Sequence, residues 1–251
     1  MNRHIGFERL HNVRDLVGYR TSDGAYVVPR TVYRADSLGK LQGADWETFL
    51  GLGIRTVIDL RHPWEIEARG RVPEAERFEY VNLSIEHRPY DQAMIDPDLD
   101  PWRYLADRFA EVADDGADEI RRVIGHLAQS PVPVVFHCTS GKDRTGLIAA
   151  LLLTLLGVPR DDVLADFALT ELATARLLAD WHTANPDRQM RWPWYGRAPA
   201  VVMELTLADL EAEYGSVQGY LTDHVNLDPE TVEQLRRRLL TDVRAEPGPG
   251  T

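Results

Sequence analysis

The chain has 251 residues, of which 44% are hydrophobic and 27% charged, so it has enough apolar material for a sizeable core. Its formal net charge of −12 at pH 7 disfavours general binding to nucleic acids or anionic membranes, because the overall field repels polyanions. A single cysteine, Cys138, excludes an intrachain disulfide and a CxxC metal site, and this usage fits a reducing compartment.

No segment of the sequence indicates export or membrane insertion. Residues 1–16 lack the apolar region of a signal peptide. The most apolar run, residues 147–158, is shorter than the roughly 20 residues that a bilayer requires, so it predicts a buried helix. We expect a cytoplasmic protein, or one exported without a recognisable signal peptide, and no stable membrane insertion.

The first hundred residues predict strands, turns and one short helix. The expected elements are a hairpin with strands at 16–19 and 25–28, a strand at 31–34, a helix near 46–50, strands at 55–60 and 78–83, and a loop over 86–101. Apolar residues at i, i+3 and i+4 indicate the helix, and runs of β-branched residues indicate the strands.

The remainder of the chain is mostly helical in pattern. The expected elements are helical segments over 102–129, a strand at 131–136, a buried helix ending near 157, a helix over 163–179, an irregular loop over 181–198, and helices over 199–214, 217–225 and 229–240. Interleaved strands and helices favour an α/β layered fold. Because no Gly-, Ser- or Pro-rich linker divides the chain, we expect one domain over 1–244 and a flexible tail at 245–251.

The most informative segment is HCTSGKDRTG, residues 137–146, which lies between the apolar strand and the apolar helix. A loop between a strand end and a helix start directs several backbone N–H groups to one point, and the helix N-terminus adds positive potential. These features predict an anion site. Cys138 lies at its mouth, where the nucleophilic thiolate is favoured. Arg144 can grip two phosphate oxygens, while Gly141 and Gly146 permit close backbone approach.

Two other interpretations of this loop are less consistent with its residues. A lone cysteine is commonly a small buried hydrophobe, but the GKDR sequence that follows Cys138 is not typical of that role. A nucleotide P-loop requires Gly-x4-Gly-Lys followed by Ser or Thr. Here Asp143 follows Lys142, and no glycine precedes Gly141 by five positions.

The motif HC-x5-R-T-G resembles the signature of the cysteine-dependent protein tyrosine phosphatase superfamily. The full HCTSGKDRTG is similar to its atypical bacterial branch, which includes tyrosine and dual-specificity enzymes with phosphoinositide activity. Further similar segments are NVRDLVGY at 12–19, YRAD at 33–36, IDLR at 58–61 with Glu65, YGSV at 214–217 and YL at 220–221. Val17 stands where the family usually has a second glycine. The resemblance implies a mostly parallel central sheet flanked by helices, with N-terminal β structure and C-terminal helices.

The resemblance also implies a mechanism without metal or cofactor. Cys138 would attack phosphorus and form a phosphocysteine, Arg144 would hold the phosphate oxygens, and Thr145 would hydrogen-bond the sulfur. The other residues that the resemblance places around the phosphate are Thr139, Ser140, Gly141 and Lys142. His137 would orient the loop. We include Asp59 and Arg61 as supporting residues, although a surface or structural role for Arg61 is the stronger interpretation.

The general acid is the least determined role. Asp143 is the leading candidate by resemblance, and its alternative is a structural hydrogen bond that braces the loop. The rival acids are Asp91, Asp96, Asp98 and Asp100 in the proline-rich loop, and Asp59 at a strand end. An acid must come within hydrogen-bond reach of the leaving oxygen, which requires a structure.

Residues 188–197 reverse the local charge of this acidic chain. They contain three arginines, Arg188, Arg191 and Arg197, together with Trp192, Trp194 and Tyr195, and no acid. They predict either a lid over the pocket or a patch for a phosphoinositide headgroup. The alternative is that the tryptophans pack beneath a long loop.

We expect a phosphomonoester hydrolase, first of all a protein-tyrosine phosphatase, acting on a phosphotyrosine protein or a phospholipid headgroup. Dual-specificity or phosphoinositide phosphatase activity is the alternative within the same chemistry. A non-catalytic phosphate-binding module is the alternative of another class, and Cys138, Arg144 and Thr145 together argue against it. The lack of a second cysteine disfavours a reductase that forms an intrachain disulfide. No nucleic acid partner is expected, and the sequence leaves the oligomeric state open.

Overall fold

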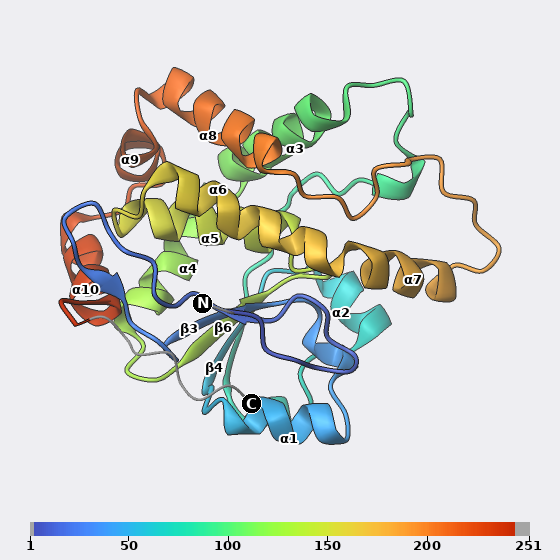
Figure 1. The fold of residues 1–251 in the computed structure, drawn as a ribbon, viewed down its shortest axis with the longest axis horizontal. Helices are drawn as coiled ribbons and strands as arrows, with labels where there is room; N and C mark the ends of the chain where they lie inside the picture. Colours follow the sequence, from blue (N-terminus) through green and yellow to red (C-terminus); the bar gives the residue numbers. More distant parts are fainter. Residues whose placement is uncertain (1–2, 244–251) are drawn as a thin grey trace.

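The computed structural model describes residues 3–243, and its centre is a five-stranded sheet in the order β1-β3-β6-β4-β5 (Figure 1). The strands are β1 (Arg14–Asp15), β3 (Val32–Ala35), β4 (Thr56–Asp59), β5 (Glu79–Asn82) and β6 (Val134–His137). β3, β6, β4 and β5 are parallel, and β1 pairs antiparallel with β3. The expected mostly parallel sheet is confirmed, and β6 lies at its middle.

Helices cover both faces of this sheet. They are α1 (Ala44–Gly51), α2 (Pro63–Arg69), α3 (Pro101–Asp115), α4 (Ala117–Gln129), α5 (Asp143–Leu155), α6 (Arg160–Ala168), α7 (Thr174–Ala184), α8 (Ala200–Tyr214), α9 (Val217–Gly219) and α10 (Pro229–Leu239). Short 3-10 segments occupy Leu38–Lys40, Ala75–Arg77, Gln92–Met94 and Leu169–Ala173, and a π-helical turn spans Tyr220–His224. The α/β class expected from the sequence is confirmed.

The alternation of side chains along β6 divides the core into two clusters. Val134 and Phe136 pack into the larger cluster with α3, α4, α5, α8 and α10, whereas Val135 packs into the smaller one with Phe49 of α1. Both sides of the central strand are buried, as expected for a parallel strand that is covered by helices on each face.

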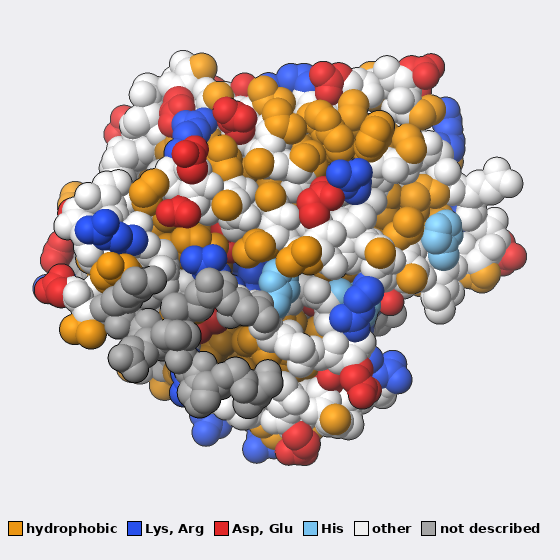
Figure 2. Space-filling model, in the orientation of Figure 1, with side chains coloured by type: hydrophobic (Ala, Val, Ile, Leu, Met, Phe, Trp, Pro, Cys, Tyr) orange, Lys and Arg blue, Asp and Glu red, His pale blue; other side chains and the backbone are white. Residues whose placement is uncertain are grey.

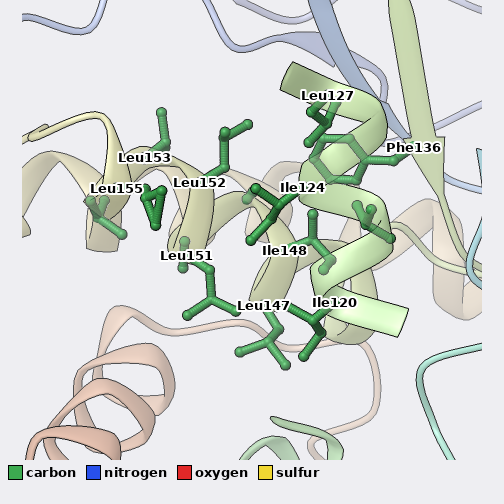
Figure 3. Packing of buried hydrophobic residues seen from close by; sticks show 14 of the residues in the cluster. Ile120, Ile124, Leu127, Phe136, Leu147, Ile148, Leu151, Leu152, Leu153 and Leu155 are labelled. Carbon is green, nitrogen blue, oxygen red and sulfur yellow. The ribbon is translucent and has the colours of Figure 1, made fainter. Parts of the chain in front are cut away.

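The predicted buried helix is α5, whose residues from Arg144 to Leu153 are all buried. Figure 3 shows Leu147 and Ile148 of α5 beside Ile120 and Ile124 of α4. At the start of this helix, a Cβ on Gly146 would lie 2.9 Å from the ring of Phe167. Glycine therefore allows α5 to approach α6 closely.

The N-terminal β structure differs in part from the predicted hairpin. The chain does fold back, because Val27 N donates to Tyr19 O at 2.9 Å and Gly18 N donates to Val27 O at 3.1 Å. However, the strand β2 (Tyr26–Val27) pairs with β7 (Leu240–Thr241) near the other end of the chain. A strand of two residues carries no sequence periodicity, so β7 was missed. The tail predicted for 245–251 lies outside the described residues, and the one-domain assignment of 1–244 stays a prediction.

Several helix boundaries also differ from the predicted ones. Helix α2 was missed, although Pro63 occupies its first turn and His62 N donates to the Glu65 carboxylate at 2.9 Å, as in a capping box. The segment 102–129 divides at Gly116, where a Cβ would lie 2.4 Å from Ile85 O. The helix expected over 163–179 divides into α6, a 3-10 turn and α7.

The surface in this orientation mixes acidic and basic side chains, with hydrophobic side chains gathered over the upper half of the view (Figure 2). Within residues 3–243, no helix combines the length and the apolar character needed to cross a bilayer.

Candidate active site

The motif of residues 137–146 is placed at the carboxyl end of the central strand. β6 ends at His137 and α5 begins at Asp143, so residues 138–142 form the connecting loop. The ends of the two neighbouring strands, Ala35 and Asp59, are in register with His137. The crevice outside the carboxyl ends of parallel strands is where α/β proteins commonly bind ligands.

The carbonyl groups of this loop are held from outside by distant residues. Arg34 Nη2 donates to Gly141 O at 2.7 Å, Asn12 Nδ2 donates to Ser140 O at 3.0 Å, and Ser37 N donates to Thr139 O at 3.1 Å. The backbone N–H groups of residues 139–142 make no hydrogen bond within the described part of the chain. Free N–H groups beside a helix N-terminus are suited to an anion.

Gly141 adopts a φ of 67°, and a Cβ at this position would lie 2.7 Å from Ala35 O. Both the backbone conformation and the close approach to β3 therefore require glycine here.

Arg34 is itself held by a buried ionic cluster behind the loop. Its Nη1 lies 2.6 Å from Asp166 Oδ2, while Arg14 Nε and Tyr19 OH donate to Asp166 Oδ1 at 3.1 and 3.0 Å. Burial opposes ionisation of Asp166, but the charges of Arg14 and Arg34 hold its pKa well below the usual range. The motifs at 12–19 and 33–36 thus brace the loop from behind.

Cys138 is the first residue after β6 and is only 1% exposed. His137 is fully buried, and its Nδ1 donates to Cys138 O at 3.2 Å. Burial lowers the pKa of His137, so the ring is neutral near pH 7. A neutral ring bonded to the loop backbone can fix the position of Cys138.

Arg144 is fixed by a bidentate ion pair with Glu65 of α2. Its Nη1 and Nη2 donate to the two carboxylate oxygens at 2.6 and 2.9 Å. Burial alone would raise the pKa of Glu65, but the hydrogen bonds and charge of Arg144 lower it to about 2. Burial opposes the charge of Arg144, whereas the hydrogen bonds and charge of Glu65 raise its pKa above the usual range. Thr139 Oγ1 also donates to Glu65.

Asp143 and Lys142 lie at the start of α5. Asp143 faces the hollow beside Arg144 with its side chain 28% exposed, a position from which a carboxyl group can reach a bound ligand. Lys142 is buried, and its Nζ lies 3.2 Å from both Asp143 Oδ1 and Gln92 Oε1. Thr145 Oγ1 is buried without a hydrogen-bond partner among residues 3–243.

Asp59 and Arg61 form a buried pair at the end of β4. Arg61 Nε donates to Asp59 Oδ1 at 2.9 Å and its Nη1 donates to Ser37 Oγ at 3.0 Å, while Tyr80 OH donates to Asp59 Oδ2 at 2.8 Å. Burial opposes ionisation, but His137, Arg61 and these hydrogen bonds lower the Asp59 pKa to about 2. Arg61 is fully buried in this pair, which favours a structural role over a surface one, and an ionised, fully bonded Asp59 is poorly suited to donate a proton.

Of the four aspartates in the proline-rich loop, Asp91 lines the same hollow as Asp143. It is paired with Arg188, and its Oδ1 accepts from Ala93 N at 3.2 Å. Asp96 accepts from Asp98 N, and Asp100 begins α3 by accepting from Trp102 N at 3.0 Å. The side chains of Asp91, Asp96 and Asp100 are thus engaged in local turns and caps.

The loop opens into a hollow of about 430 Å³. Its other walls include Trp64, Arg69, Glu86, Pro89, Tyr90, Gln92, Trp181, Asn185, Arg188 and Tyr195. A second hollow of about 320 Å³ shares five of the lining residues with the first: Arg69, Thr139, Ser140, Trp181 and Tyr195. The loop therefore opens between walls that include the aromatic side chains of Trp64, Tyr90, Trp181 and Tyr195.

The segment 181–198 forms one of these walls. Helix α7 continues to Ala184, and the residues that follow it in this segment are irregular, as predicted. Trp192 is fully buried against Tyr104, and Trp194 packs on Trp102, which confirms the packing interpretation of these tryptophans. The lid and headgroup roles stay predictions.

Within residues 3–243, no three or more His, Cys, Asp and Glu side chains are grouped so that they could hold a metal.

Residues 5–241 match the sequence profile of the Tyrosine phosphatase family. The chain belongs to the tyrosine phosphatase family. This membership supports its classification as a phosphatase enzyme, as the sequence predicted. It also accounts for the segments outside the loop that resembled the family, because the match extends over nearly the whole chain.

This family member is 30% identical to a Cupriavidus necator protein that is provisionally named a tyrosine-protein phosphatase, over 94% of this chain and 88% of the relative. It is 29% identical to a tyrosine-protein phosphatase of Nostoc commune, over 86% and 76%. It is 26% identical to the triple specificity protein phosphatase PtpB of Mycobacterium tuberculosis, over 91% and 96%.

Among solved structures, P. aeruginosa TpbA is similar with 17% identity and a TM-score of 0.32, over 76% of this chain and 96% of TpbA. A Cys-to-Ser variant of TpbA in complex with phosphotyrosine gives 19% identity and a TM-score of 0.31, over 73% and 88%.

The site of this phosphatase includes residues that sequence reasoning did not place there. Glu65 was noted only as part of a motif, and Arg34 and Asn12 likewise, whereas Glu86 and Gln92 were not singled out at all. Arg34 and Asn12 lie in the motifs at 33–36 and 12–19, which was the available signal. Glu86 and Gln92 lie in the segment predicted as a loop over 86–101, where no pattern distinguishes them from solvent-facing residues.

Proposed function

We propose that this protein is a protein-tyrosine phosphatase that acts through a phosphocysteine intermediate on Cys138. One observation carries the proposal: Cys138 begins a loop of free backbone N–H groups at the N-terminus of α5, beside an Arg144 that Glu65 holds in place. A family member with a thiol, an anion loop and a fixed guanidinium at one point has the parts that phosphoryl transfer through cysteine requires.

The substrate phosphate occupies the loop, where the N–H groups of Thr139, Ser140, Gly141 and Lys142 and the guanidinium of Arg144 hold its three non-bridging oxygens. The Cys138 thiolate attacks phosphorus in line as the bond to the leaving oxygen breaks. Asp143 donates its proton to that oxygen, so the alcohol leaves neutral.

In the second step a water molecule attacks the phosphocysteine, and Asp143 accepts a proton from it. The P–S bond breaks, and inorganic phosphate and the Cys138 thiolate are released. Thr145, whose buried hydroxyl has no partner in the described chain, donates a hydrogen bond to the departing sulfur. His137 fixes the loop through Cys138 O, while Asp59 and Arg61 support the strand end behind it.

Phosphotyrosine is the substrate that the walls of the hollow favour. Tyr90, Trp181, Tyr195 and Trp64 line a space of about 430 Å³, which is suited to an aromatic ring attached to the phosphate. The names of the relatives from Cupriavidus necator and Nostoc commune agree with this class of substrate.

A wider substrate range, including phosphoserine, phosphothreonine or a phosphoinositide headgroup, is the second candidate. Arg69 and Arg188 line the hollow, and although Arg188 is paired with Asp91, Arg69 adds positive charge to the wall. The relative from Mycobacterium tuberculosis is named a triple specificity phosphatase.

The test compares wild type with Cys138→Ser on p-nitrophenyl phosphate and on matched phosphotyrosine, phosphoserine and phosphoinositide substrates. We expect turnover by the wild type, highest kcat/KM on phosphotyrosine, loss of turnover in the variant, and a phosphoenzyme trapped by acid quench in the wild type alone. Substantial activity in Cys138→Ser would refute the mechanism. A wild type that binds phosphate but turns over none of the substrates would indicate a non-catalytic binding module.

A further inference from the structure

A second carboxylate approaches Arg144 from the loop that follows β5. Glu86 Oε2 lies 3.6 Å from Arg144 Nε, and the Glu86 side chain is only 13% exposed. Glu86 also lines the hollow in which the substrate would bind. Its role is not explained by the proposed mechanism, since Glu65 already fixes the guanidinium.

The two carboxylates contact different edges of the guanidinium. Glu65 accepts from Nη1 and Nη2, which together form the end of the planar group. Nη1 also approaches Leu60 O at 3.5 Å. The edge that remains for a second bidentate partner consists of Nε–H and the outer N–H of Nη2, and Glu86 lies against its Nε. A phosphate gripped by two parallel hydrogen bonds needs this same edge.

We propose that Glu86 competes with the substrate phosphate for Arg144, so that the site admits a phosphate ester when Glu86 takes up a proton. This inference rests on the proposed function, because it assumes that the phosphate binds to Arg144. A dianion and a carboxylate cannot share one edge of a guanidinium without strong repulsion. Protonation removes the charge of Glu86 and turns it from a competitor into a possible hydrogen-bond donor to a phosphate oxygen.

The surroundings of Glu86 place its protonation near neutral pH. The charged or titratable groups around Glu86 come from four elements. They are Arg144 and Asp143 from α5, Glu65 and His62 from the start of α2, Arg108, Glu111 and Asp115 from α3, and His87, Arg88 and Tyr90 from its own loop. Burial raises the pKa of Glu86 to about 7, with Arg144 opposing this shift and Asp143 and Glu65 adding to it. An incoming dianion adds negative charge and favours the protonated form further.

Protonation of Glu86 determines how the anion affinity of the site changes with pH. Below about pH 7 Glu86 is already protonated, so anion affinity does not depend on this group. Above about pH 7 binding must take up one proton, so the affinity falls about tenfold for each pH unit.

The test measures sulfate binding by calorimetry from pH 5.5 to 8.5. Sulfate keeps its double charge across this range, and the Cys138→Ser background removes the thiol and turnover. We expect sulfate affinity in Cys138→Ser to fall about tenfold per pH unit above pH 7. In Cys138→Ser/Glu86→Gln, which replaces the carboxyl with a neutral group of the same shape, affinity should be nearly independent of pH.

A second measurement needs no double variant. Binding heats for Cys138→Ser in buffers of different ionisation enthalpy should show uptake of about one proton per sulfate at pH 8. Sulfate affinity that is independent of pH in Cys138→Ser, without proton uptake, would overturn the role of Glu86 and leave the proposed function intact. An unchanged pH slope after Glu86→Gln would do the same. Failure of Cys138→Ser to bind sulfate at any pH would overturn the phosphate pocket itself, and the proposed function with it.

Discussion

Arg34 Nη2 donates a hydrogen bond to Gly141 O at 2.7 Å, although the two residues are 107 positions apart in the chain. Through this contact an arginine of β3 sets the orientation of a peptide group in the anion loop. The same arginine is bonded to the buried Asp166 at 2.6 Å, so the loop is connected to α6 through one side chain. The geometry of the loop therefore depends on a cluster whose residues do not line the hollow in front of the loop.

The Asp166 cluster gives the first prediction. Asp166→Asn removes the counter-charge of two buried arginines, Arg14 and Arg34, and should destabilise the fold by about 3–5 kcal/mol. Urea unfolding at pH 7 measures this change. The control is Glu211→Gln, which breaks the half-exposed ion pair with Arg160 and should cost less than about 1 kcal/mol. Equal effects of the two substitutions would contradict the assigned role of the cluster.

Gly141 gives the second prediction. Gly141→Ala forces a side chain into left-handed backbone and against Ala35 O, so the loop must shift. We expect turnover of p-nitrophenyl phosphate to fall at least about 100-fold, because displacement of catalytic groups by about 1 Å has effects of this size. Gly53→Ala is the matched control, since Gly53 has a φ of 70° but open space at its Cβ. It should cost about 1 kcal/mol of stability and leave kcat unchanged.

The loop and the elements on either side of it could be predicted from the sequence because their signals are local. An apolar strand, a glycine-containing loop and an apolar helix follow one another within residues 131–157. The partners of the loop could not be predicted in this way. Glu65 reaches Arg144 across 79 positions, and the two meet because α2 follows β4, whose end lies beside the end of β6.

The same distinction applies to the elements that were missed. β7 has only two residues, and it pairs with β2, which lies at least 213 positions away in the chain. No local sequence pattern therefore predicts it. Helix α2 did carry a local signal, since proline precedes glutamate by two positions as in a capped first turn. Glu86 lies in a loop, and its burial depends on α3 and α5 packing around it.

Glu65 leads to the third prediction. In Glu65→Gln, Arg144 loses its charged bidentate partner and becomes free to adopt other rotamers. We expect kcat/KM on p-nitrophenyl phosphate to fall by about 10- to 100-fold in Glu65→Gln. Glu65→Asp, which keeps the charge on a shorter side chain, should have a kcat/KM below that of the wild type. Glu74→Gln, which breaks an exposed ion pair with Arg77, is the control and should keep the wild-type rate. A Glu65→Gln enzyme with wild-type kcat/KM would show that Arg144 is held by other contacts.

Acid stability provides the fourth prediction. The pKa values of Glu65 and Asp59 are lowered to about 2, chiefly because Arg144, His137 and Arg61 outweigh the effect of burial. Carboxyls with lowered pKa stabilise the fold above their ordinary pKa, near 4, and this contribution is lost as the pH falls towards 2. Asp15 acts in the opposite direction, because burial raises its pKa to about 6 and its ionisation destabilises the fold.

The free energy of unfolding should therefore decrease steeply between about pH 4 and pH 2. Urea unfolding at pH 2.5, 4 and 6 measures this dependence. Asp59→Asn should be less stable at pH 6 and should lose part of the decrease below pH 4, whereas Glu211→Gln should keep the wild-type slope. An identical slope in Asp59→Asn and wild type would contradict the low pKa of Asp59.

Asp143 leads to the fifth prediction, which concerns the general acid. It lines the hollow at the start of α5, and the proposed mechanism assigns its carboxyl to protonate the leaving oxygen. In Asp143→Asn no proton is available, so the rate should depend on the leaving group. We expect kcat to fall by about 10²- to 10⁴-fold on an alkyl phosphate and much less on p-nitrophenyl phosphate, whose leaving group is stable as an anion.

Asp91→Asn is the matched control, because Asp91 lines the same hollow but is paired with Arg188. It should change the alkyl phosphate rate by less than about threefold, a loss well below that of a proton donor. If Asp143→Asn keeps its full rate on the alkyl phosphate while Asp91→Asn loses it, the acid is Asp91 and the loop aspartate is structural. If both variants keep the rate, the proton comes from a third group, and Glu86, which protonates near neutral pH beside Arg144, becomes the next residue to replace.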